Sequence, residues 1–237
     1  MQKPAAAGTL HLLEVCAYKD SALAHEWAMR GYAAVRVAHR RDRSPKPGPE
    51  PVLGRALTWY LDLDNEEDKK LLFNYAAERK PEDLWTSPDC RPFTSVHQIN
   101  QSRLGRRWRP AGEKESLEML AYCRELHQAQ VERVGRCHHE QSAMSHAPFD
   151  SGVWPWAIST PPVSVKVAGC SVGLKYKEKL LAKEWRIEST SFPLLAALEP
   201  YKCAGGHEHG RSLGRLWATA KYPPFFAHIV AEVLLKT

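Results

Sequence analysis

Apolar and polar positions in the first half of the chain follow two periods, one typical of strands and one typical of helices. Four short, mainly apolar runs are expected to form buried strands: residues 9–17, 33–38, 56–63 and 83–87. Residues 22–29 and 66–79 repeat their apolar side chains at helical spacing, with Ser21 and Asn65 as N-terminal caps. Strands that alternate with helices in this way predict βαβ units and a mostly parallel sheet.

The second half of the chain begins with a long amphipathic segment. It predicts a helix over residues 113–134, closed by Gly135, and then a short strand over residues 136–141. Beyond Ser142, tryptophan and proline accumulate and four further elements are predicted: strands over 163–167 and 185–189, and helices over 192–198 and 222–233.

These elements predict the α/β class, with a Rossmann-like, doubly wound, mostly parallel sheet and a small C-terminal α+β extension. We expect three parts. They are a Rossmann-like core over residues 1–150, an extension over 151–217 for target recognition or zinc binding, and a closing helix over 218–237 that packs back on the core.

Composition narrows the class of protein without identifying it. The 237 residues are 43% hydrophobic and 25% charged, as in an ordered globular protein with one sizeable core. Lysine and arginine outnumber the acidic residues by 33 to 27, so the net charge of +6 is compatible with a polyanionic partner but does not require one. No apolar run is long enough to span a bilayer.

The cysteines bear on the compartment. Six are scattered along the chain without any Cys-x-x-Cys pair: Cys16, Cys90, Cys123, Cys137, Cys170 and Cys203. Because no secretory apolar segment lies near Met1, we expect reduced thiols in an intracellular protein. Among intracellular compartments, the nucleus is favoured over the cytoplasm.

The stretch Ser87-Pro88-Asp89-Cys90 ends the fourth apolar run and places a thiol in the loop that follows. Open α/β sheets bind ligands at the carboxyl ends of their strands, where Cys90 would lie. Glu140, on the next predicted strand, would reach the same edge. A thiolate is a strong nucleophile, and a carboxylic acid beside it can protonate a substrate ring nitrogen as the thiolate adds. The alternative is a small buried thiol in a turn.

These residues resemble motifs of the cytosine-5 DNA methyltransferases. The Pro-Pro-Cys of that family corresponds to Pro88-Asp89-Cys90, its Glu-Asn-Val glutamate to Glu140, and its closing Pro-Pro motif to Tyr222-Pro223-Pro224. A closer likeness is to methyltransferase-like domains of retroelement polyproteins, which run from Leu-Leu-Glu-Val to a Cys-x-Gly-x-His-x-His loop. This likeness extends over nearly the whole chain, and Ser-Pro-x-Cys and Tyr-Pro-Pro are its specific parts.

The resemblance implies a fold of the S-adenosylmethionine-dependent methyltransferase type, which binds that cofactor and a base flipped out of DNA. Cys90 would attack the pyrimidine ring, while Glu140 would hold and protonate it. The cofactor-binding residues implied are Glu14, Ala17, Asp62, Asp64, Pro88 and Tyr222. For Asp62 and Asp64, an acid that caps a helix is the alternative interpretation.

The chain also departs from the family pattern near these residues. The loop of residues 17–21 contains no glycine, whereas the cofactor loop of the family is glycine-rich so that its backbone can approach the methionine. Ala38-His39-Arg40 replaces the acid expected for the ribose hydroxyls. Asp89 replaces a neutral proline, and its carboxylate should raise the pKa of the Cys90 thiol unless Arg91 offsets it.

Metal-ligand residue types gather in one loop near the C-terminus. Cys203, His207 and His209, with Cys170 as a fourth ligand, predict a closed, structural zinc site. Their spacing is not that of a standard zinc finger. The alternative is an exposed turn marked by the two glycines between Cys203 and His207.

Basic residues follow the Cys90 loop directly and predict contacts to DNA or another nucleic acid. The residues concerned are Arg91, Arg103, Arg106, Arg107 and Trp108, the last as a stacking surface. Residues 40–46 are also basic, but a solvated loop is the favoured interpretation there.

Three functions therefore follow from the sequence. The first is an active methyltransferase that acts on cytosine in DNA, which Cys90, Glu140 and Tyr222 favour. The second is a catalytically inactive methyltransferase-like module that binds nucleic acid or a partner protein. The third is a structural subunit of a larger assembly that reuses the fold. The loop without glycine and Asp89 favour the second and the third.

Overall fold

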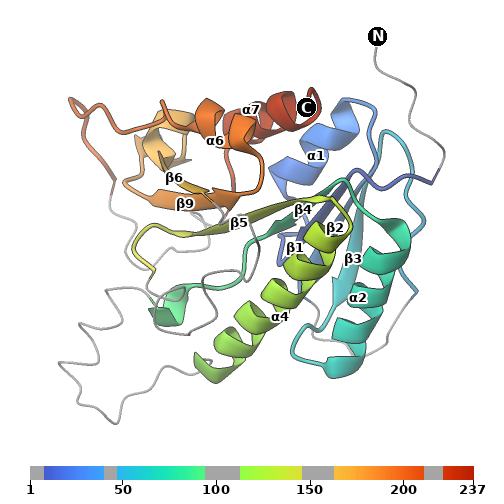
Figure 1. Ribbon diagram of the computed structural model, residues 1–237. Coiled ribbons are helices and arrows are strands. Elements are labelled where there is room, and N and C mark those ends of the chain that lie inside the picture. Colours follow the sequence, from blue (N-terminus) through green and yellow to red (C-terminus); the bar gives the residue numbers. More distant parts are fainter. Residues whose placement is uncertain (1–7, 40–46, 94–112, 146–162, 211–220) are drawn as a thin grey trace.

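A seven-stranded sheet forms the centre of the computed structural model, which describes residues 8–39, 47–93, 113–145, 163–210 and 221–237 (Figure 1). The strands lie in the order β3-β2-β1-β4-β5-β9-β6. Their bounds are Leu12–Val15 for β1, Ala34–His39 for β2, Ala56–Leu61 for β3, Asp83–Thr86 for β4, Arg136–Ser142 for β5, Val163–Ala168 for β6 and Glu184–Ser189 for β9. A separate hairpin pairs β7, Lys175–Tyr176, with β8, Lys179–Leu180.

The first five strands are all parallel to one another. Strand β9 runs antiparallel to both of its neighbours, β5 and β6, so the sheet is mixed. The order 3-2-1-4-5 is Rossmann-like, with its topological switch point between β1 and β4. The predicted α/β class and mostly parallel sheet are therefore confirmed.

Helices cover both faces of this sheet (Figure 1). On one face lie α1, Ala22–Met29, α6, Phe192–Leu198, and α7, Pro224–Leu234. On the other lie α2, Glu66–Arg79, and α4, Glu113–Glu132. Two 3-10 turns, η1 at Arg91–Phe93 and η2 at Gly169–Val172, complete the described elements. Among these residues, no helix combines the length and hydrophobicity that crossing a bilayer requires.

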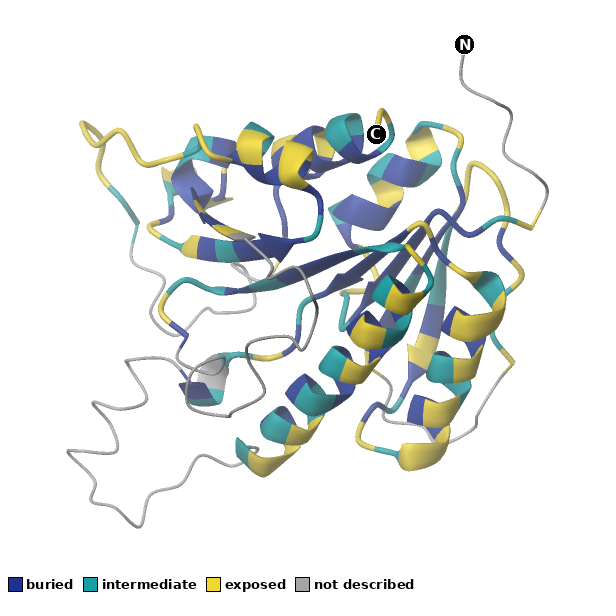
Figure 2. Ribbon diagram, viewed as in Figure 1, coloured by how far each residue is buried: buried dark blue, intermediate teal, exposed yellow. Residues whose placement is uncertain are grey.

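Each face of the sheet has its own hydrophobic core, and Figure 2 shows the sheet and the helix sides turned toward it as buried. Large aromatic residues fill the core under α1, α6 and α7, including Trp27, Trp85, Trp185 and Phe226, each at most 1% exposed. Aliphatic residues dominate the core under α2 and α4. Because aromatic side chains bury the most area per residue, the first core anchors α7 against the sheet.

Local sequence signals set several helix boundaries as predicted. Asn65 caps α2 by accepting hydrogen bonds from the backbone N–H groups of Glu67 and Asp68, at 2.8 and 3.2 Å. Ser21 caps α1 through the N–H of Leu23. The bounds of α2 and α6 coincide with the predicted ranges.

Two local predictions need correction. Helix α4 ends at Glu132, and Val134 rather than Gly135 adopts the left-handed backbone, with φ of 64°. At Gly135 a Cβ atom would instead collide with the side chain of Gln130, so the glycine is needed for close packing. The β7–β8 hairpin was not predicted because its turn residues, Lys177 and Glu178, adopt positive φ without the usual Asn-Gly pair.

The C-terminal third of the chain contributes to the central sheet. Strand β9 pairs with β5 from Ser142↔Trp185 to His138↔Ser189, and β6 pairs with the other edge of β9. Helix α7 then packs against α1. These elements bring residues after 163 close to the carboxyl end of β5.

Candidate functional site

Strands β4 and β5 carry the two predicted catalytic residues to one edge of the sheet. Thr86 at the end of β4 pairs with His139, so the chain positions that follow, Ser87 and Glu140, lie beside each other. Glu140 lies within β5 rather than after it. Cys90 follows β4 in the loop before η1 and is half-buried, as is Glu140. The parallel register brings the chain after β4 beside Glu140, close enough for the charge of Glu140 to raise the pKa of Cys90.

Tyr222 completes this group. Its hydroxyl donates a hydrogen bond to Oε2 of Glu140 at 3.1 Å and accepts one from Nε1 of Trp85 at 3.0 Å. Oγ of Ser87 lies 2.7 Å from the same hydroxyl. The sequence suggested a cofactor contact for Tyr222, whereas here its polar atom orients Glu140. Pro223 occupies the N-cap position of α7, and the Tyr222 ring before it packs against Phe226 in the aromatic core.

The electrostatics keep both Glu140 and Cys90 protonated to higher pH than usual. Burial raises the pKa of Glu140, and Lys183 and Tyr222 only partly oppose this effect. Burial also raises the pKa of Cys90, followed by the negative charge of Glu140 and, more weakly, of Asp89. The backbone of Ser142 and the ammonium of Lys183 lower it. The predicted direction for Asp89 is right, but burial and Glu140 contribute more.

The acid expected at the cofactor loop is already engaged. Glu14 on β1 is 2% exposed, and Oγ of Ser21 donates a 2.6 Å hydrogen bond to its Oε1. Burial raises its pKa to about 7, against the opposing effects of Ser21, the Ala24 backbone and Arg36. Since Ser21 also caps α1, Glu14 fastens the end of β1 to the start of that helix.

The loop after β1 makes its turn without glycine. Cys16 adopts a left-handed backbone with φ of 62°, a conformation that glycine takes at lower energetic cost. The N–H of Ala17 then donates to the carbonyl of Val37, which ties the loop to β2. Tyr18 is 43% exposed. The backbone turn is thus present, but it is formed by residues with side chains and not by glycine.

Asp62 and Asp64 lie just after β3, at the same edge of the sheet. The N–H of Asp64 donates to Oδ1 of Asp62 at 3.2 Å, and the N–H of Asp62 donates to Oδ2 of Asp68 at 2.7 Å. The helix cap is Asn65, so capping does not explain either acid. Together with His39 at the end of β2, their ligand atoms lie within 4.8 Å of one another.

The remaining residues predicted for binding are placed as follows. Pro88 is buried between β4 and Cys90. Four residues predicted to contact nucleic acid lie outside the described residues: Arg103, Arg106, Arg107 and Trp108. The side chain of Arg91 lies outside them as well.

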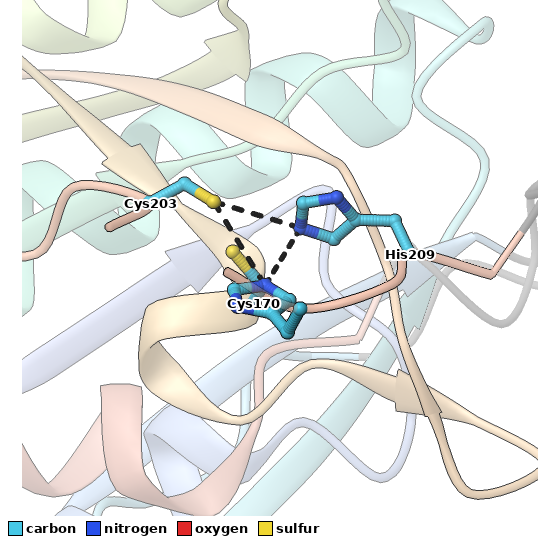
Figure 3. Close-up of side chains that lie close together, drawn as sticks. Cys170, Cys203 and His209 are labelled. Carbon is cyan, nitrogen blue, oxygen red and sulfur yellow. Dashed lines mark hydrogen bonds between the residues drawn. The ribbon is translucent and has the colours of Figure 1, made fainter. Parts of the chain in front are cut away.

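A separate Cys2His2 group lies between η2 and the loop after α6 (Figure 3). Cys170 comes from η2, while Cys203, His207 and His209 come from the loop after α6. The four ligand atoms lie within 4.8 Å of one another. Cys170 is buried, and Cys203 is exposed. This group can hold a metal ion such as zinc.

A buried polar network at the amino ends of β4 and β5 was not predicted. Asp83 is 0% exposed and forms two hydrogen bonds with Arg136, at 2.7 and 2.9 Å. His138 bridges Asp83 and Ser189, at 3.0 and 2.8 Å. This Asp-His-Ser order matches a hydrolase triad, but His138 and Ser189 are 0% and 3% exposed, so the network is structural. The sequence did not indicate this network, because Asp83 lies in a segment that was recognised only as an apolar strand.

Comparison with protein-family models and with curated protein sequences finds no match to this chain. The arrangement of its own residues therefore carries the functional argument.

Proposed function

We propose that this protein is an S-adenosylmethionine-dependent methyltransferase-like protein that methylates cytosine in DNA through Cys90. The proposal is carried by the meeting of Cys90 and Glu140 at the carboxyl edge of β4 and β5, with Tyr222 hydrogen-bonded to Glu140. Open α/β sheets bind their ligands at this edge. The strand order 3-2-1-4-5 is consistent with a methyltransferase-type sheet.

The chemistry proposed for these residues begins with addition to the base. The sulfur of Cys90 forms a bond to a ring carbon of cytosine, and a ring nitrogen takes the proton held by Glu140. The raised pKa of Glu140 suits this role, because the carboxyl group remains a proton donor closer to neutral pH. Because its raised pKa keeps Cys90 in the thiol form near neutral pH, the thiol proton must pass to solvent before the sulfur adds to the ring. Tyr222 orients the acid.

S-adenosylmethionine, when bound, supplies an electrophilic methyl group. Asp62 and Asp64 offer carboxylates at the correct edge of the sheet, but the residues after β1 do not fit the cofactor. Glu14 is buried and bonded through Oε1 to Ser21, and Cys16 carries a side chain where the backbone would have to approach the cofactor. The residues that fit the proposed reaction are therefore Cys90, Glu140 and Tyr222.

That misfit favours a second candidate function. The chain would be a catalytically inactive methyltransferase-like module that binds nucleic acid or a partner protein, or serves as a structural subunit of a larger assembly. The specific observation is the burial of Glu14, which is 2% exposed and accepts a hydrogen bond from Ser21 through Oε1. In this case Cys90 and Glu140 would have a structural role and would catalyse no reaction.

Nucleic acid binding belongs to the first candidate and is one form of the second. The basic segment with Arg103, Arg106 and Arg107 follows the Cys90 loop in the sequence, and Trp108 adds a base-stacking surface. Phosphate contacts release counterions, so the affinity for a short DNA should fall steeply as salt rises. Replacing Arg106 and Arg107 with glutamine should flatten this salt dependence, whereas a flat response of the unchanged protein would contradict nucleic acid binding.

Calorimetry with S-adenosylmethionine on the purified chain separates the two functions. Binding is expected for the enzyme, and methyl transfer to DNA should then be lost in Cys90→Ser and Glu140→Gln. Cys137→Ser serves as the matched control, because it removes a buried thiol away from the site. No heat of binding at millimolar cofactor would overturn the enzyme and leave the binding module.

A further inference from the structure

The spacing of the atoms in the Cys2His2 group matches that of ligands around one metal ion. Nε2 of His207 and Nε2 of His209 are 2.9 Å apart, and Sγ of Cys203 lies 3.8 and 3.6 Å from them. At usual zinc bond lengths, tetrahedral ligands stand about 3.3 Å apart for two nitrogens and about 3.5 Å apart for nitrogen and sulfur. The four side chains therefore enclose a volume suited to one zinc ion.

The loop also presents the correct nitrogen of His207. Its Nδ1 lies 3.1 Å from the carbonyl oxygen of Gly205, to which an N–H at this position donates. That hydrogen bond leaves the lone pair of Nε2 directed at the group, as second-shell partners do in zinc sites. Gly205 and Gly206 have φ of 73° and 74°, which turns the chain back so that His207 and His209 face Cys203.

Backbone hydrogen bonds connect this group to the segment that borders β5. The N–H of Gly169, next to Cys170, donates to the carbonyl of Lys183 at 2.6 Å. A Cβ atom at residue 169 would come within 2.9 Å of that oxygen, so only glycine permits the contact. On the other side, the N–H of Gly210 donates to the carbonyl of Leu180 at 2.7 Å. Both segments that carry metal ligands are thus hydrogen-bonded to residues 180–183, at the end of the β7–β8 hairpin.

Lys183 lies at the edge of the sheet where Cys90 and Glu140 meet. It immediately precedes β9, and the carbonyl of Glu184 accepts a hydrogen bond from Ala143, just past the end of β5. The Lys183 ammonium lowers the pKa of both Cys90 and Glu140. A change in the position of this backbone would therefore reach the candidate site.

We propose that Cys170, Cys203, His207 and His209 bind one structural zinc ion, and that this ion fixes the segment from Gly169 to Lys183 against the carboxyl end of β5. All four positions around the ion are filled by protein, so it stabilises the fold and has no open position for substrate. The consequence for Cys90 and Glu140 rests on the proposed function; zinc binding itself does not.

Metal analysis of the purified full chain, after loading with zinc and removal of excess, tests the first half of the proposal. We expect one zinc ion per chain, and loss of that zinc in Cys203→Ser and in His209→Ala. Cys90→Ser and His25→Ala are matched controls that should keep it, since neither residue belongs to the group. Cobalt in place of zinc should give the thiolate-to-metal absorption of a tetrahedral S2N2 site. Absence of metal, or equal metal in Cys203→Ser, would overturn the site.

Hydrogen exchange with and without a chelator tests the second half. Removal of zinc should speed exchange of the amides of Gly169, Leu174, Leu181 and Gly210, while the amides of β1 and β4 keep their protection. Unchanged exchange in the 169–184 segment after the metal has gone would overturn the positioning of Lys183. Neither measurement uses S-adenosylmethionine or DNA, so failure here is distinct from failure of the proposed function.

Discussion

The hydroxyl of Tyr222 donates a hydrogen bond to Oε2 of Glu140 at 3.1 Å, although 82 residues separate them. The same hydroxyl accepts from Trp85 and meets Ser87, so it joins the ends of β4 and β5 to the start of α7. Glu140 is thereby held beside Cys90 by a residue from the last element of the chain. The integrity of the candidate site and the docking of α7 are consequently linked.

Tyr222→Phe should therefore reduce the stability of the whole fold. Removal of the buried hydroxyl leaves Trp85, Ser87 and Glu140 with an incomplete network, which we expect to lower the free energy of unfolding by about 1–2 kcal/mol. Urea denaturation measures this change. Tyr60→Phe is the matched control, because Tyr60 is 43% exposed and its hydroxyl removal should change stability by less than about 0.5 kcal/mol. Equal effects would show that the network contributes nothing.

The reactivity of Cys90 should report the charges around it. Burial, Glu140 and Asp89 raise its pKa, so Glu140→Gln and Asp89→Asn should each shift its alkylation by iodoacetamide to lower pH, the first by more. Lys183→Gln should shift the profile to higher pH, because a nearby positive charge is lost. Mass spectrometry of the peptide that contains Cys90 follows the reaction. Coincident profiles for all four proteins would contradict this account of the site.

The ion pair between Asp83 and Arg136 should be asymmetric in its response to substitution. Arg136→Met leaves the carboxylate of Asp83, which is 0% exposed, without its main partner, and should cost about 3–5 kcal/mol. Asp83→Asn should cost less, since the Arg136 side chain is 25% exposed and can reach water. Chemical denaturation compares the two, with Arg55→Met at an exposed position as control. A larger loss for Asp83→Asn would reverse the argument.

Ionisation of Glu14 and Glu188 should reduce stability as pH rises from about 4.5 to about 7. The lowered pKa values of His11, His127 and His139 act in the opposite direction below their ordinary value of 6.5. The native pKa values of Glu14 and Glu188 are raised to about 7, mainly by burial, from an ordinary value of 4.5. At these two groups the native state therefore holds more protons than the unfolded state in this window, and the stability that they provide is lost as they ionise. At about 1.4 kcal/mol per pKa unit, Glu14 alone accounts for a change on the order of 3 kcal/mol.

Glu14→Gln should remove the Glu14 contribution, so that stability falls less, or rises more, between pH 4.5 and 7 than in the unchanged protein. Glutamine keeps the oxygen that accepts from Ser21 but cannot ionise, so the variant should gain stability relative to the unchanged protein near neutral pH. Unfolding free energies at several pH values between 4 and 8 provide the measurement. Glu67→Gln, at an exposed position on α2, should leave the slope as it is. An unaltered slope for Glu14→Gln would contradict the raised pKa.

The sequence by itself determined the elements and the fold class. Helix α2 begins after Asn65 because that side chain bonds the first-turn N–H groups, and such caps act between residues close in the chain. The buried strands were recognisable from their apolar runs for the same reason. The sequence also identified the reactive groups and metal ligands, because residue type alone determines the functional group. These residues are Cys90, Glu140, Cys203, His207 and His209.

Tertiary structure alone decided which of these groups meet. The parallel pairing of β4 with β5 sets Ser87 beside Glu140, and the docking of α7 brings Tyr222 to them. It also decided that Asp83, in an apolar strand, is paired with Arg136. These contacts join segments far apart in the sequence, so they depend on strand register and helix packing, which local patterns do not encode.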